Sequence, residues 1–192
     1  MNAFWREEAL NESESKLLTL CLEAHSKSAM RSNFSSVAVA QSAAASGDFT
    51  KAITAGLSML GGMHAPLAQS WEVLTGNMDL EFFFDGGKVP GWGNSFEKCH
   101  PDPLWGEVSE CLKEHFPKIH SRICEITDAL HKDGKVVFPN PSCFTAAVGL
   151  ALKMEPKIIP WIFVSGRLNA WAYLFIQQTC ADKSCHTSKE KN

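Results

Sequence analysis

The sequence predicts an all-α protein, folded as a single multihelical domain over residues 1–192. Of the 192 residues, 45% are hydrophobic and 20% are charged, so the chain can bury one substantial core. Apolar residues recur at helical spacing along almost the whole chain. Only KVVF, residues 135–138, has the character of an extended segment. Together these observations predict helices packed around one core.

The first predicted helix spans about residues 13–26. Its apolar residues recur at helical spacing, and they are Leu17, Leu18, Cys21 and Leu22. Residues 35–62 are dense in Ala, Ser and Gly and predict two further helices that break near Ser46-Gly47. Asp48 is a good cap for the second of them, and Gly61-Gly62 is its expected end. Small side chains let helix backbones approach closely, so we expect these helices inside a core or at a subunit interface.

Three more helices are predicted between residues 65 and 134. Residues 65–76 form the first. Residues 103–116 place apolar side chains on one stripe and charged ones opposite, which is the pattern of an amphipathic helix. Residues 118–134 repeat that pattern on the next helix. Both amphipathic helices are expected to cover the core with one face.

The C-terminal part of the chain predicts two helices and a polar tail. Asn140 can cap a helix and Pro141 suits its first position, so a helix should begin there and run on to about residue 154. Residues 156–178 are the most apolar segment, but Arg167 near a bilayer centre would cost roughly 3 kcal/mol. We therefore expect a buried core helix and no membrane span. Residues 179–192 are polar, and we expect them to be frayed.

Charge and composition limit the partners and the compartment. Lys and Arg number 18 against 21 Asp and Glu, and a net charge of −3 gives no basic field for a nucleic acid. The first sixteen residues are charged and lack the features of a secretory signal, so we expect a cytoplasmic location. Seven cysteines form no regular framework, and we expect free thiols.

Three side chains are candidates for ligand contacts. Arg167 lies among apolar residues, where a guanidinium needs an anion or several carbonyls to offset its lost hydration. The anion could be a ligand carboxylate or an intramolecular Asp or Glu. His64 follows two glycines, which permit close approach of a ligand, although a structural role is also open. His25 near the end of the first helix could simply favour the helix dipole.

The cysteines give two weaker hypotheses. Thiolate or imidazole groups that could bind zinc are carried by Cys99, His100, Cys180, Cys185 and His186. The spacing of the last three fits no standard structural zinc module, so we expect no metal. Cys143 lies at a predicted helix N-terminus, which would lower its pKa and suit a nucleophile beside His64. No third member of such a catalytic set is visible.

Three segments resemble the C-terminal half of the citrate synthase family, which includes 2-methylcitrate synthases and citryl-CoA lyases. Residues 52–74 resemble a helix, a Gly-Pro-Leu-His-Gly-Gly-Ala turn and the following helix. Residues 89–103 resemble a Pro-Gly-Phe-Gly-His-Arg-Val-Tyr loop that ends in Asp-Pro-Arg. Residues 139–175 resemble Pro-Asn-Val-Asp-Phe-Tyr-Ser-Gly and a later helix with a substrate arginine. The resemblance covers about residues 20–178.

The resemblance implies a citrate-synthase-like multihelical fold, a homodimer, and chemistry that joins an acyl-CoA to an oxo acid or cleaves the product. It puts His64 on the histidine that hydrogen-bonds a thioester enolate and Arg167 on an arginine that holds a carboxylate. His25 falls near the upstream substrate histidine. The implied adenine-binding backbone of coenzyme A comprises Val89, Pro90, Gly91, Trp92 and Gly93.

The sequence departs from the family's pattern at three positions. Asn94 replaces a catalytic histidine, Ser142 replaces the aspartate base, and Leu104 replaces the arginine of Asp-Pro-Arg. A serine hydroxyl is far too weak to remove the α-proton of a thioester unaided. Recognition of adenine by backbone needs no titratable group at residue 94, so binding can persist where the chemistry changes.

Three hypotheses about function follow. The first is a citrate-synthase-like protein that binds an acyl-CoA and an oxo acid and uses an altered acid/base set, with Glu97 or His100 as candidates. The second is a catalytically silent homologue that acts as a regulatory or assembly subunit. The third is a zinc-dependent module, which a metal analysis would exclude.

Overall fold

The computed structural model of the chain describes Trp5 and residues 7–31, 33–60, 65–84, 87–94, 96–98 and 100–186. Its helices are α1 (Glu12–Ala29), α2 (Phe34–Ser46), α3 (Phe49–Ser58), α4 (Leu67–Thr75), α5 (Glu81–Phe84), η1 (Pro103–Trp105), α6 (Gly106–His115), α7 (Pro117–Lys132), α8 (Pro141–Ala151), η2 (Pro156–Ile158) and α9 (Pro160–His186). No described residue belongs to a strand of a sheet, although Trp92 and Pro139 form an isolated antiparallel bridge. The predicted all-α class is confirmed.

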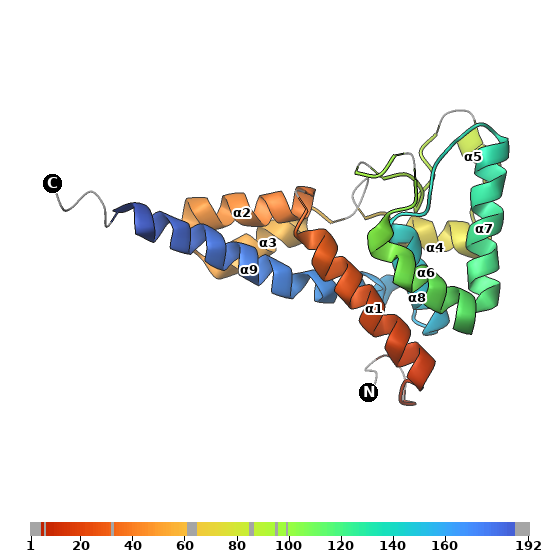
Figure 1. Ribbon diagram of the computed structural model, residues 1–192, viewed down its shortest axis with the longest axis horizontal. Helices are drawn as coiled ribbons and strands as arrows, with labels where there is room; N and C mark the ends of the chain where they lie inside the picture. The colour runs from red at the N-terminus through yellow and green to blue at the C-terminus, as the bar shows by residue number, and fades with distance from the viewer. Residues whose placement is uncertain are drawn as a thin grey trace.

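The helices form a compact body and an arm (Figure 1). The body contains α4, α6, α7 and α8, and the arm is made by α2, α3 and the distal half of α9. Helix α1 packs on the body and on α9, and so connects the two parts. The larger hydrophobic core lies in the body, and a smaller cluster in the arm consists of Ala29, Val39, Ala43, Ala52, Ala170 and Trp171.

Small residues allow the three helices of the arm to pack closely. A Cβ at Gly56 of α3 would meet the Val39 side chain of α2 at 2.6 Å and the Trp171 ring of α9 at 3.3 Å. No larger residue fits there without displacing its neighbours. The expectation that these helices lie within a core therefore holds for this face of α3.

Polar caps fix the helix starts that the sequence signals. The Asp48 side chain accepts a hydrogen bond from the Lys51 amide, and α2 ends at Gly47 with φ of 60°. The Asn140 side chain accepts from the amides of Ser142 and Cys143 at the start of α8. Both predicted caps are confirmed. The stop expected at Gly61-Gly62 lies outside the described residues, and α3 itself ends at Ser58.

Helix α9 corrects two expectations. Ile162, Phe163 and Trp171 are buried, but Tyr173 and Ile176 are about half exposed, so only the first part of α9 is a core helix. The helix also runs on to His186, whereas fraying was expected from residue 179. No helix within the described ranges combines the length and apolar character needed to cross a membrane.

Candidate functional site

The loop of residues 89–94 is held to the start of α8 by its backbone. The Gly93 amide donates to the Phe138 carbonyl at 2.9 Å, and the Asn140 amide donates to the Gly91 carbonyl at 2.9 Å. The Asn140 side chain closes the connection, since its Nδ2 donates to the Gly93 carbonyl at 2.8 Å. The same side chain caps α8 through its Oδ1. The loop and the α8 N-terminus therefore form one hydrogen-bonded unit.

Two glycines of this loop have left-handed backbone, for different reasons. Gly91 has φ of 91°, and a Cβ there would lie 3.0 Å from Ser70 Oγ and 3.2 Å from Cys143 Cβ. Gly93 has φ of 85°, but its nearest neighbour would be Val137 Cγ1 at 3.8 Å. Gly91 is thus required by both conformation and packing, whereas the space beside Gly93 is open.

The side chains of the loop turn inward. Trp92 is 5% exposed and its Nε1 donates to Thr127 Oγ1 on α7 at 2.9 Å, while Val89 is 6% exposed. Their contribution is to anchor the loop on the body. What the loop can offer a ligand is mainly its backbone, together with the half-buried Pro90 and the exposed Lys88.

The Asn94 side chain is held on both sides. Its Nδ2 donates to Asp102 Oδ2 at 3.0 Å, and its Oδ1 accepts from the Phe96 amide at 3.0 Å. Asp102 is buried and forms a bidentate ion pair with Arg31 at 2.8 and 3.2 Å. Asn94 therefore belongs to a structural network that includes Arg31. The sequence analysis missed Arg31, which sits in a polar turn after α1 with no motif to mark it.

Two titratable groups lie next to that network. Glu97 Oε1 lies 4.0 Å from Arg31 Nη2, and Glu97 Oε2 lies 3.3 Å from His100 Nε2. The Glu97 side chain is 24% exposed and that of His100 is 62% exposed. This carboxylate–imidazole pair can exchange protons with solvent. It is the acid/base pair nearest along the chain to Asn94.

Ser142 joins the loop through the α8 cap. Its amide donates to Asn140 Oδ1 at 2.9 Å, and the residue is 5% exposed. Its hydroxyl makes no hydrogen bond with any described residue. Ser142 therefore lies two residues after Asn140, whose side chain holds the loop in place. No base among the described residues is hydrogen-bonded to the Ser142 hydroxyl to activate it.

His25 is buried in the core and not at the end of α1, which runs on to Ala29. Its Nε2 lies 2.7 Å from Thr145 Oγ1, which itself donates to the Pro141 carbonyl at 2.6 Å. The Thr145 hydroxyl must then accept from His25 Nε2–H, and Nδ1 carries the lone pair without a partner among described residues. Burial, and then the Arg167 charge, lower the pKa of His25 well below its usual value. A neutral His25 provides no charge for the helix dipole, so that interpretation is wrong.

Arg167 is buried beside His25 without a carboxylate partner in the described part of the chain. Its Nη1 donates to Asn33 Oδ1 at 3.0 Å and to Ser35 Oγ at 3.1 Å, and its guanidinium lies 4.0 Å from the centre of the Phe163 ring. Desolvation lowers the pKa of Arg167 to about 10, so it stays charged at neutral pH. The described residues supply dipoles and a π face, but no Asp or Glu.

The remaining candidates divide into two groups. His64 and Cys99 lie outside the described residues. Cys143 is fully buried, and burial raises the pKa of its thiol, so the prediction of a nucleophile with a lowered pKa is wrong. Among the described residues, no group of three His, Cys, Asp or Glu side chains is placed to hold a metal ion.

Comparison with solved structures identifies the fold. A citryl-CoA lyase from Hydrogenobacter thermophilus superposes with a TM-score of 0.72 at 17% identity, covering 90% of this chain and 72% of the lyase. A citrate synthase from Thermoplasma acidophilum, in a ternary complex with carboxymethyl coenzyme A and oxaloacetate, gives 0.71 at 18% identity and 88% coverage of this chain. A citrate synthase from Thermotoga maritima gives 0.72 at 19% identity and 88% coverage.

These likenesses establish a citrate-synthase-like fold, as the sequence resemblance implied. The chain spans about half the length of the two citrate synthases, 49% and 50%. No family model and no curated protein matches the sequence.

Proposed function

We propose that this protein binds a coenzyme A thioester through the backbone of Val89, Pro90, Gly91, Trp92 and Gly93. The main support for the proposal is that hydrogen bonds from Asn140 and to the Phe138 carbonyl fix this loop against the start of α8. A loop held in one conformation can present those of its peptide groups that are not already hydrogen-bonded to an adenine without any titratable side chain, and it loses little conformational entropy on binding. A related fold in complex with a carboxymethyl coenzyme A supports this choice of ligand.

An oxo acid is the proposed second substrate, and Arg167 is its proposed anchor. The guanidinium is charged, 3% exposed and bonded only to neutral acceptors among described residues. A carboxylate is the ligand group that best compensates such a charge. His25 next to it is neutral, so it can hydrogen-bond the oxo acid. This requires that its hydrogen bond with Thr145 breaks first.

Any carbon–carbon bond chemistry would need an acid/base set other than Asn94 and Ser142. Asn94 is bound to Asp102 and to the Phe96 amide, and neither it nor a serine hydroxyl takes a proton from carbon at neutral pH. Glu97 with His100 is the proposed substitute, with His64 as the group that stabilises the enolate. Loss of thioester turnover in Glu97→Gln, with acyl-CoA binding retained, tests this assignment.

The second candidate is a catalytically silent subunit, favoured by the hydrogen bonds that occupy Asn94 and His25.

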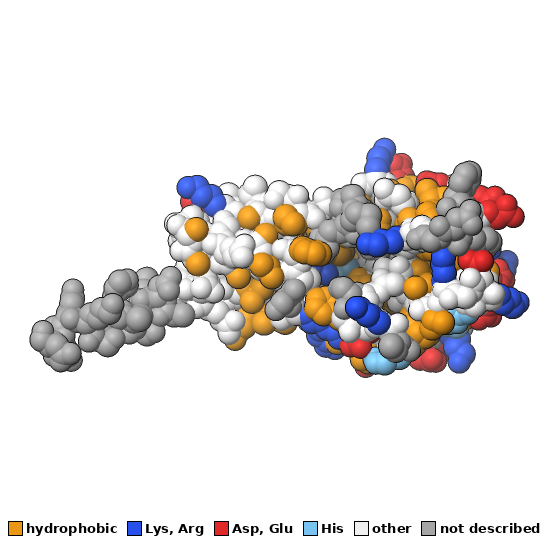
Figure 2. All heavy atoms as spheres, turned by 90° about the horizontal axis from the view of Figure 1, so that it is seen from above, with side chains coloured by type: hydrophobic (Ala, Val, Ile, Leu, Met, Phe, Trp, Pro, Cys, Tyr) orange, Lys and Arg blue, Asp and Glu red, His pale blue; other side chains and the backbone are white. Residues whose placement is uncertain are grey.

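For either function we propose a cytoplasmic homodimer formed by the arm. In Figure 2, hydrophobic side chains are exposed on the arm among few charged ones, whereas most charged side chains in view lie on the body. The exposed apolar residues of the arm helices and their ends include Phe34, Phe49, Leu57, Met59, Tyr173 and Ile176. Such a surface is typical of a subunit interface.

Calorimetry with acetyl-CoA, coenzyme A and adenosine tests the proposal. Binding of the two CoA ligands, weakened several-fold by Asn140→Asp in a protein that remains folded, would support the loop as the site. No heat at millimolar acetyl-CoA would overturn it. Binding together with release of free CoA thiol in the presence of an oxo acid indicates an enzyme, whereas binding without turnover indicates the silent subunit.

A further inference from the structure

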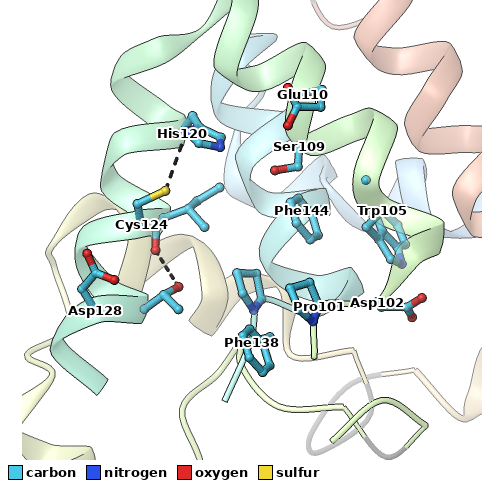
Figure 3. Close-up of a pocket in the computed structure, with 14 residues that line it drawn as sticks. Pro101, Asp102, Trp105, Ser109, Glu110, His120, Cys124, Asp128, Phe138 and Phe144 are labelled. Carbon is cyan, nitrogen blue, oxygen red and sulfur yellow. Dashed lines mark hydrogen bonds between the residues drawn. The ribbon is translucent and has the colours of Figure 1, made fainter. Parts of the chain in front are cut away.

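A cavity that no residue of the loop 89–94 lines lies between α6, α7 and the start of α8 (Figure 3). Its volume is about 370 Å³, within the range of small-molecule sites. Neither Asn94 nor Ser142 lines it, and no residue of 89–93 does. It is therefore not part of the proposed CoA site.

The inner wall of this cavity is aromatic. Trp105 and Phe144 stack with their ring centres 5.6 Å apart and their planes 6° apart. Phe138 and Pro139 continue the apolar wall on the side of the loop anchor. Helix α7 contributes Ile123. A flat apolar group of a ligand would bury its surface against this wall.

The charges around the cavity are negative. Its lining contains Asp102, Glu110 and Asp128 but no Lys or Arg. Asp102 is neutralised by Arg31, and Glu110 has an exposed Lys113 at 3.8 Å, a pair that is weak in water. Asp128 is exposed and has no ion pair with any described residue. This lining repels the phosphates of coenzyme A and the carboxylates of oxo acids.

We infer that the cavity is a binding site for a compact aromatic amine. The ring packs against the aromatic wall, and the protonated amine lies at the mouth near Asp128. The carboxylate favours a positive group there. The inference goes beyond the proposed function, because it concerns a different ligand of opposite charge at a different place.

A matched pair of probes tests the charge preference. Tryptamine and indole-3-propionate share a ring and chain length but carry opposite charges. By calorimetry, we expect tryptamine to bind at least tenfold more tightly than the anion. Asp128→Asn should weaken tryptamine about three- to fivefold, as expected for one exposed charge pair. Glu155→Gln, at an exposed carboxylate outside the cavity, should leave it unchanged. Equal binding of the two probes would overturn the inference.

The reactivity of a cysteine in the cavity can show where the probe binds. Cys124 lines the cavity and lies 3.7 Å from His120 Nδ1, and it is an exposed free thiol. Cys180 is also exposed but lies on α9. Tryptamine should slow alkylation of Cys124 by iodoacetamide and leave that of Cys180 unchanged. Protection of both, or of neither, would contradict binding in this cavity.

A substitution that fills part of the cavity can remove ligand binding without changing the stability of the fold. Gly106 lines the cavity, is exposed and has helical backbone, and a Cβ there meets nothing within 4 Å. Gly106→Phe should therefore fold while occupying part of the space. We expect tenfold or greater loss of tryptamine affinity with an unchanged unfolding midpoint. A stably folded Gly106→Phe protein that binds tryptamine as the wild type does would refute the assignment.

Discussion

The loop of residues 89–94 and the side chains around it are fixed by different parts of the chain. The loop is shaped by peptide groups and by glycines whose left-handed backbone has a steric reason at Gly91. Around it, the side chains of Asn94 and His25 are held by side chains of other segments. Asp102 lies 8 positions from Asn94, and Thr145 lies 120 positions from His25. A backbone site can thus persist while the side chains beside it change, and the two regions should respond differently to substitution.

The largest expected effect separates the two glycines of the loop. Gly91→Ala combines left-handed strain with contacts at 3.0 and 3.2 Å and should cost about 2–5 kcal/mol of unfolding free energy. Gly93→Ala carries the strain alone and should cost about 1–2 kcal/mol. Urea denaturation of both variants measures the difference. Equal losses would show that packing at Gly91 contributes nothing.

A pH effect should come from the buried histidine. The folded-state pKa of His25 lies well below its usual value of 6.5, so below that pH the unfolded chain binds the proton more readily. Stability contributed by neutral His25 is present above pH 6.5 and falls as the pH drops, by up to about 1.4 kcal/mol per pH unit.

Denaturation of the wild type and of His25→Gln between pH 7 and pH 5 isolates this contribution. The variant should show a shallower slope than the wild type. If His25→Gln is as steep as the wild type, the histidine is protonated in the folded state and its assigned tautomer is wrong.

A smaller effect distinguishes the two functions of Asn140. Asn140→Asp keeps the oxygen that caps α8 but removes the Nδ2 donor to the Gly93 carbonyl. We expect a loss of about 1–3 kcal/mol in stability, because the cap is retained but a carboxylate oxygen then faces the Gly93 carbonyl in place of a donor. The acetyl-CoA affinity should fall several-fold, because the loop is less rigid. Asp48→Asn, which likewise keeps the oxygen that caps its helix, here the exposed start of α3, provides the matched control and should not alter CoA binding.

The same contrast explains what the sequence could and could not predict. Helix periodicity and the caps at Asp48 and Asn140 are local signals, so the all-α fold and most helix limits follow from them. The partners of Arg167 and Asn94 lie 134 and 8 positions away along the chain, and no spacing rule predicts a bond such as Arg167–Asn33. The burial of Cys143, which reverses its expected reactivity, also depends on packing by Gly91.

The smallest expected effect concerns the chemistry. With acetyl-CoA and oxaloacetate the wild type should form negligible citrate, since Ser142 cannot take the proton, Asn94 cannot donate one as an imidazolium does, and Leu104 cannot hold a carboxylate. Ser142→Asp alone should change this rate little, because the acceptor would still be poorly held and unprotonated.

The triple variant Ser142→Asp, Asn94→His, Leu104→Arg supplies all three groups and is the appropriate test, with citrate formation and thiol release as the two measurements. The substitution at residue 94 has a structural consequence, because an imidazole must take over the bond of Asn94 to Asp102 while the Asp102–Arg31 ion pair remains. A rise in citrate formation in the triple variant only, with unchanged acetyl-CoA affinity, would show that the loop binds independently of the side chains beside it. Robust citrate synthesis by the wild type would instead show that other residues already supply the base and the acid.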